Sequence, residues 1–154
     1  MAEKHSKKQI LAHLSRQSIG ILGTIDPSGS YVRQRVMYYG LDEQFQCYMM
    51  STRQSPKINQ ILSTKTISFI VFGLEDPYDN SWETELNGHA LLLQDKKGIA
   101  TALNLLKDRN PFADVAIESG ITGQFDIIQL IPSVIRFRVY GEALKGEDST
   151  VIKL

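Results

Sequence analysis

Two short stretches of the sequence carry side chains that together could bind an anion. In the first, Arg33 and Arg35 are two residues apart in a run that reads as a strand, so both project from one face. In the second, Ser55, a proline and Lys57 have the chemistry of a helix start, where free N–H groups and the helix dipole favour negative charge. If the fold brings Arg35 to this helix start, the two stretches form a phosphate pocket. Arg53, in the connection before the helix, could then contribute to it. The alternative is that they are unconnected surface cations.

The hydrophobic pattern predicts the elements that would position these residues. Strands are expected over 19–25, 31–39, 45–51, 66–72, 82–93, 124–131 and 134–140, and helices over 6–17, from Ser55 onward, and over 95–108. The first three strands are expected to pair as a meander, and 66–72, almost continuously apolar, to be buried on both faces. Gly88 is a candidate bulge. We expect the third helix to end at 110–111 and a polar tail to follow from Gly141.

These elements favour a mainly antiparallel β fold, because seven strands with three helices among them do not alternate as a parallel doubly wound sheet requires. The length of 154 residues suits one domain, 1–154, with 141–154 as its polar tail. A single cysteine and three scattered histidines give no disulfide and no metal-ligand spacing. Seventeen basic and seventeen acidic residues cancel, so nucleic acid and membrane are not expected partners. With no apolar leader behind residues 1–8, we expect a cytoplasmic protein.

The order of short motifs resembles the pyridoxamine 5'-phosphate oxidase-like FMN-binding split barrels. The motifs are GILGTID (20–26), RQRV (33–36), FQCYMMS (45–51), TRQSPK (52–57), ISFIVF (67–72) and IPSVIRF (131–137). The resemblance covers roughly residues 6–140 and lies in the order of the motifs more than in invariant letters. It implies a six- or seven-stranded antiparallel split β-barrel with flanking helices. It also implies a homodimer with FMN bound at the subunit interface.

The same resemblance implies roles for individual residues. Arg35, Ser55 and Lys57 match the positions that hold the flavin phosphate, and residues 50–52 would run along the flavin ring. The complete set of cofactor-binding residues expected is Arg33, Arg35, Val36, Met50, Ser51, Thr52, Ser55, Lys57 and Trp82. Trp82 is included because its indole could stack on a planar cofactor, with packing in the core or at an interface as the commoner alternative for such a ring. No catalytic side chain stands out from the sequence.

Two departures from the family pattern limit the functional prediction. Glu83 and Glu85 lie where many relatives carry a glutamine that reaches the flavin ring, and the C-terminus lacks the Arg-x-His motif that binds substrate in true pyridoxamine phosphate oxidases. We therefore expect an FMN-binding oxidoreductase of unknown small-molecule substrate, and not that oxidase. Haem or a deazaflavin on the same fold, or a small-ligand binding module without catalysis, stay open as alternatives.

Three other features have simpler interpretations than a functional one. Glu83 and Glu85 share a strand face and read as a solvated surface more than as an acid pair. Cys47, between apolar residues of a strand, reads as an inert buried thiol. His89 reads as a structural histidine, with a role as ligand or proton carrier as the lesser alternative.

Overall fold

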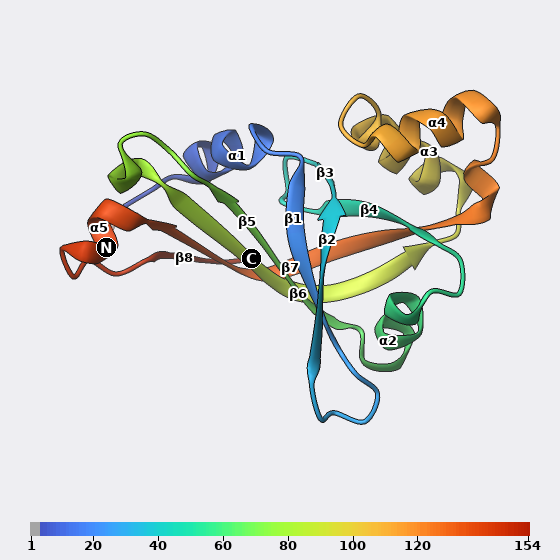
Figure 1. The fold of residues 1–154 in the computed structure, drawn as a ribbon, viewed down its shortest axis with the longest axis horizontal. Coiled ribbons are helices and arrows are strands. Elements are labelled where there is room, and N and C mark those ends of the chain that lie inside the picture. The colour runs from blue at the N-terminus through green and yellow to red at the C-terminus, as the bar shows by residue number, and fades with distance from the viewer. Residues whose placement is uncertain (1–3) are drawn as a thin grey trace.

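The strands of the computed structural model, which describes residues 4–154, form one antiparallel sheet of eight strands curled into a half-barrel (Figure 1). The first strands are β1 (Ile19–Ile25), β2 (Val32–Tyr38), β3 (Gly40–Leu41) and β4 (Cys47–Thr52). They are followed by β5 (Thr66–Gly73), β6 (Trp82–Leu93), β7 (Phe125–Val139) and β8 (Thr150–Lys153). This confirms the mainly β fold class, while residues 1–3 of the expected domain and leader region lie outside the described part.

The sheet runs in the order β2-β1-β5-β6-β7-β4-β3, with β8 on β7. The expected meander of the first three strands is therefore wrong. β1 and β2 pair as a hairpin, but β4 pairs with β7 at the opposite end of the sheet. The chain crosses from one end to the other directly after β2, because curling brings the two ends of the half-barrel close together. This crossing places β2 and β4 on either side of one pocket.

Five α-helices within residues 4–154 flank the sheet. They are α1 (Lys7–Ser15), α2 (Pro56–Thr64), α3 (Lys96–Leu106), α4 (Pro111–Ser119) and α5 (Tyr140–Leu144). Figure 1 shows α2 beside the loop end of β4 and the α3–α4 pair over the other side of that strand. Both α1 and α3 begin at a capping side chain: Ser6 accepts from Gln9 N–H in a capping box, and Asp95 accepts from Gly98 N–H. None of the helices in 4–154 is both long and apolar enough to cross a membrane.

Burial differs between the strands because the outer face of the sheet is only partly covered. β5 alternates between buried and more exposed residues, so the expected burial of 66–72 on both faces is wrong. The strand that is buried on both faces is β4, with the barrel core on one side and α3–α4 on the other. Its outward-facing Tyr48 and Met50 form a second core with Ala102, Leu106, Ala113, Ala116 and Ile127.

The chain after residue 124 also differs from the expectation. Residues 125–139 form one continuous strand, not two, because Pro132 is accommodated opposite Gly88 at a shift in register. On the other side of β7, β4 pairs only up to Leu130 and β8 only from Val134, so Pro132 faces no second ladder that would need its missing N–H. The expected polar tail is ordered as α5 and β8.

Gly88 is confirmed as a bulge position, and we predict that Gly88→Ala strongly destabilises the protein. A Cβ at this position would lie 2.0 Å from the carbonyl oxygen of Ile131, a backbone atom that cannot rotate away. We expect a loss of about 2 kcal/mol or more in the free energy of unfolding, measured by denaturant titration. Gly123→Ala is the matched control, because a Cβ there meets no atom within 4 Å, and its change should stay within about 0.5 kcal/mol. Equal stability of the two variants would contradict the bulge contact.

Candidate functional site

The start of α2 holds a lysine that contacts two hydroxyl groups. Lys57 Nζ lies 2.9 Å from Ser51 Oγ and 3.3 Å from Ser55 Oγ, and the two hydroxyl oxygens lie 3.0 Å apart. Ser55 occupies the N-cap position and a proline follows at N1, as the sequence predicts. Its hydroxyl, however, does not cap the helix and instead joins the lysine. The first turn of α2 therefore presents an ammonium and two hydroxyls at one point.

Arg35 reaches the same helix from β2. Its Nη1 donates to Thr24 Oγ1 at 2.8 Å and its Nη2 donates to Gln60 Oε1 at 3.0 Å, while the Thr24 hydroxyl donates to Gln60 Oε1 at 2.5 Å. Thr24 and Gln60 are both buried, and Gln60 lies one helical turn after Lys57. The structure thus brings Arg35 to α2, where it contacts Gln60 one turn beyond Lys57. This contact comes about through the curl of the sheet, and not through the meander that the sequence suggested.

The two cations are held without a neutralising carboxylate. Within residues 4–154, no acidic side chain lies within 4.0 Å of the Arg35 guanidinium or of Lys57 Nζ. Partial burial lowers the pKa of Lys57, and the nearby positive charge of Arg35 lowers this pKa further. Burial also lowers the pKa of Arg35, with a smaller contribution from Arg33. The site is therefore electropositive and would be stabilised by an anion.

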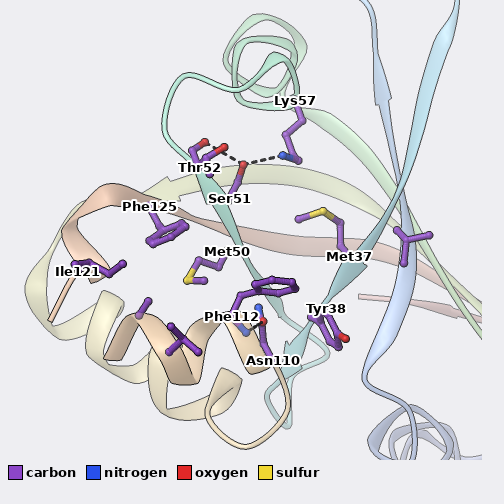
Figure 2. Close-up of a pocket in the computed structure, with 13 residues that line it drawn as sticks. Met37, Tyr38, Met50, Ser51, Thr52, Lys57, Asn110, Phe112, Ile121 and Phe125 are labelled. Atoms are coloured by element: carbon purple, nitrogen blue, oxygen red, sulfur yellow. Dashed lines mark hydrogen bonds between the residues drawn. The ribbon is translucent and has the colours of Figure 1, made fainter. Parts of the chain in front are cut away.

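A pocket of about 640 Å³ opens beside this cluster, between β2, β4 and α4 (Figure 2). Its lining residues are Val36, Met37, Tyr38, Met50, Ser51, Thr52, Lys57, Asn110, Phe112, Val115, Ala116, Ile121 and Phe125. Lys57 is the only charged side chain among them, and it lies at the end formed by the start of α2. At the α4 end the lining is apolar except for Asn110, whose side-chain oxygen caps α4. The volume suits a drug-sized or cofactor-sized molecule.

Most of the residues expected at the site gather around this pocket. Val36, Met50, Ser51, Thr52 and Lys57 line it. Arg35 and Ser55 belong to the polar cluster at its charged end through the hydrogen bonds given above.

Three other residues that the sequence analysis names do not line the pocket. Arg33 is exposed on β2, opposite Thr24 in the β1–β2 ladder, and it makes no ion pair among residues 4–154. Arg53 lies 3.9 Å from Asp126, which gives it an acidic partner of its own. The expectation that Trp82 contacts the cofactor is wrong. Its indole is fully buried in the barrel core against Phe137 and His13, so it presents no face to a ligand in the pocket.

The α4 wall of the pocket is the part that the sequence reasoning missed. Asn110 and Pro111 were expected to end a helix, but they begin another: Asn110 Oδ1 accepts from the N–H groups of Phe112 and Ala113, and Pro111 is at N1. This is the same signal, a capping residue followed by proline, that identified the start of α2. Applied here, it would have predicted α4.

Arg109 fixes α4 in place. Its guanidinium donates to the carbonyl oxygens of Tyr39, Ser15 and Gln17, which end β2 and α1, and it lies 5.3 Å from the centre of the Tyr39 ring. On α4 itself, Phe112 meets Tyr38 edge to face, with ring centres 6.2 Å apart. The apolar wall is therefore anchored to the barrel both in the turn between α3 and α4 and in the first turn of α4.

The features interpreted as structural lie outside the pocket. Glu83 and Glu85 are paired in register with Arg138 and Arg136 on β7, and Glu83 Oε1 lies 3.8 Å from the Arg138 Nη1. Cross-strand pairing with arginines accounts for both acids as a surface pattern. Cys47 is fully buried, which raises the pKa of its thiol. His89 is exposed on β6, away from the lining of the pocket.

No family model matches the sequence, and no curated protein matches it either. Solved structures do match. A conserved hypothetical protein of Mycobacterium tuberculosis aligns with a TM-score of 0.77 and 16% identity, over 92% of this chain and 89% of that one. A heme binding protein from Mycobacterium smegmatis aligns with a TM-score of 0.78 and 15% identity, over 99% of this chain and 60% of that one.

A candidate pyridoxamine 5'-phosphate oxidase from Listeria innocua aligns with a TM-score of 0.66 and 20% identity, over 88% of this chain and 98% of that one. TM-scores of this size establish a shared fold, whereas identities of 15–20% leave the ligand to be argued from the site. The chain has the split-barrel fold that pyridoxamine 5'-phosphate oxidase-like proteins and a heme binding protein share.

Proposed function

We propose that the protein binds FMN in the pocket between β2, β4 and α4 and acts as a flavin-dependent oxidoreductase on a small molecule. The observation that carries the proposal is the pairing of Arg35 and Lys57 at one end of an apolar pocket without a carboxylate between them. Two partly buried like charges repel each other, and a phosphate would remove that cost. FMN joins a phosphate to a planar apolar ring and therefore matches both ends of the pocket.

The residues of the chain divide into two groups under this proposal. Arg35, Lys57, Ser51 and Ser55 would hold the phosphate, because all four present donors at the start of α2. The apolar residues of the pocket, such as Phe112 of α4, would contact the ring and exclude water from it. When bound, FMN itself supplies hydride and electron transfer. The side chains supply binding, orientation and a dry surface.

We also propose that the protein is a homodimer with the cofactor site at the subunit interface. The outer face of β1, β2 and β5 is not covered by any helix of residues 4–154 and carries a row of apolar side chains across the three strands, Val36, Ile21 and Ile70. Val36 is 68% exposed and also lines the pocket, so the uncovered face and the pocket adjoin. A second copy of the chain would cover such a face.

Haem is the second candidate ligand. The heme binding protein of M. smegmatis shares the fold over 99% of this chain, and the pocket has the apolar character that a porphyrin requires. The pocket lining contains no histidine, so an axial ligand would have to come from Met37, Met50 or Tyr38. The absorbance spectrum of the purified protein distinguishes the bands of a flavin from the Soret band of haem.

The first prediction from the proposed function concerns the binding of the FMN phosphate. Lys57→Met and Arg35→Met should each weaken FMN binding by about 10- to 100-fold, because each removes a charge-assisted hydrogen bond to the phosphate. Riboflavin, which has the same ring and no phosphate, should bind the wild type and both variants with similar affinity. Both ligands can be titrated through the quenching of flavin fluorescence.

Lys96→Ala is the control for this experiment, since Lys96 is an exposed lysine at the start of α3. It should leave FMN binding unchanged. A wild-type protein that is colourless as purified and does not bind added FMN would refute the proposal. FMN binding without any reductant-dependent turnover would instead leave a ligand-binding module.

The second prediction concerns the dimer. Ile21→Glu should convert the protein from dimer to monomer, because it places a charge in the middle of the apolar row on the outer face. Light scattering coupled to size-exclusion chromatography measures the mass directly. Leu144→Glu changes an equally apolar, 72% exposed residue on α5 and should leave the mass unchanged. A monomeric wild type would exclude the interface.

The third prediction concerns pH and the ligand-free protein. Because the pKa of Lys57 is lowered in the folded state, the unfolded state binds more protons between that lowered value and the ordinary lysine value of about 10.4. The stability of the wild type should therefore rise, relative to Lys57→Met, as the pH increases through this window. Added phosphate should reduce the difference. Denaturant titrations from neutral pH to about pH 10 would detect this difference in stability. Identical pH profiles for the wild type and Lys57→Met would contradict the lowered pKa of Lys57.

A further inference from the structure

The three-way hydrogen-bonded cluster of Arg35, Thr24 and Gln60 holds a charged group with two neutral partners. Arg35 has only donors, so the Gln60 atom that faces it must be the amide oxygen, and the Thr24 oxygen likewise accepts from it. The Thr24 hydroxyl donates its proton to Gln60 Oε1, so each of the three side chains is hydrogen-bonded to the other two. Both acceptors are buried and come from different elements, β1 and α2, so they fix the guanidinium in orientation and in distance from Lys57.

The common way to hold a partly buried arginine is a carboxylate, which forms a bidentate pair with it. Such a pair would neutralise the guanidinium and occupy two of its donors. Here the arginine uses one N–H of Nη1 and one of Nη2, and the remaining donors have no hydrogen-bond partner among residues 4–154. Glutamine therefore provides the geometry of a glutamate without its charge.

We propose that Gln60, with Thr24, is a positioning residue that orients Arg35 toward the phosphate site while leaving its positive charge available to the ligand. The proposal rests on the anion site of the proposed function. It goes beyond it by assigning a task to a buried side chain that does not line the pocket. It also gives a reason for the residue type at position 60: a neutral acceptor is required there, and a negative one would compete with the ligand.

The charge of residue 60 can be changed with almost no change of shape. Gln60→Glu keeps the size and the acceptor oxygen, pairs with Arg35 and should leave the protein at least as stable as the wild type in thermal unfolding. It should nevertheless weaken FMN binding by about tenfold or more, because the phosphate must then compete with a carboxylate for the guanidinium. Riboflavin binding should not change. A residue with a purely structural role would show the opposite pattern, with binding retained whenever stability is retained.

Three further variants separate charge from packing. Asn59→Asp makes the same amide-to-carboxylate change on the neighbouring, exposed residue of α2 and should leave FMN binding within about twofold of the wild type. Thr24→Ser keeps the hydroxyl and should bind FMN like the wild type. Thr24→Val removes the hydroxyl and should weaken FMN, but not riboflavin.

Inorganic phosphate is the second probe, because it tests the anion site without the flavin ring. If the wild type binds phosphate but not FMN, and Gln60→Glu loses phosphate, the positioning role stands although the proposed function fails. If the wild type binds FMN and Gln60→Glu binds it equally well, the positioning role is overturned and the proposed function remains. Failure of the wild type to bind either probe would overturn both.

Discussion

The site depends on two positive charges, those of Arg35 and Lys57, that the fold holds near one another in partly buried surroundings. In a protein that had no use for an anion, this arrangement would be unfavourable, since burial lowers the pKa of both groups and the charge of Arg35 lowers that of Lys57 further. The chain does not relieve it with a carboxylate, and it uses three buried polar partners, Thr24, Gln60 and Ser51, to hold the cations in place. The anion of the proposed function would relieve this conflict.

The local parts of this arrangement can be predicted from the sequence. The start of α2 follows from a serine, a proline and a lysine in sequence, and the strand character of 32–38 follows from its residue types. Gly88 is predicted as a bulge because a lone glycine inside a strand pattern is typical of a bulge or a close backbone approach. Each of these inferences uses residues within one turn or one strand, where propensity and capping dominate.

The long-range parts cannot be predicted in the same way. Nothing in residues 31–52 distinguishes a meander from a crossing between the two ends of a curled sheet, because both need the same strands and similar turns. The sequence also predicts the wrong strand as the one that is buried on both faces. β5 reads as the most buried strand, yet β4 is covered on both faces, because α3 and α4 lie outside it. Trp82 is expected at the ligand since an indole can stack, but its large apolar surface is used in the core instead.

The two walls of the pocket explain how one fold can serve different ligands. Its charged end is built from the barrel and α2, so it depends on the curl of the sheet that this chain shares with its structural neighbours. Its apolar end belongs to α4, which packs on β4 through Ala113 and Ala116 and follows a turn that Arg109 ties to the barrel. Under the proposed function, α4 would therefore provide the surface that contacts the part of the ligand beyond the phosphate. Phe112, 68% exposed at the pocket and in contact with Tyr38, is the side chain best placed to make that contact.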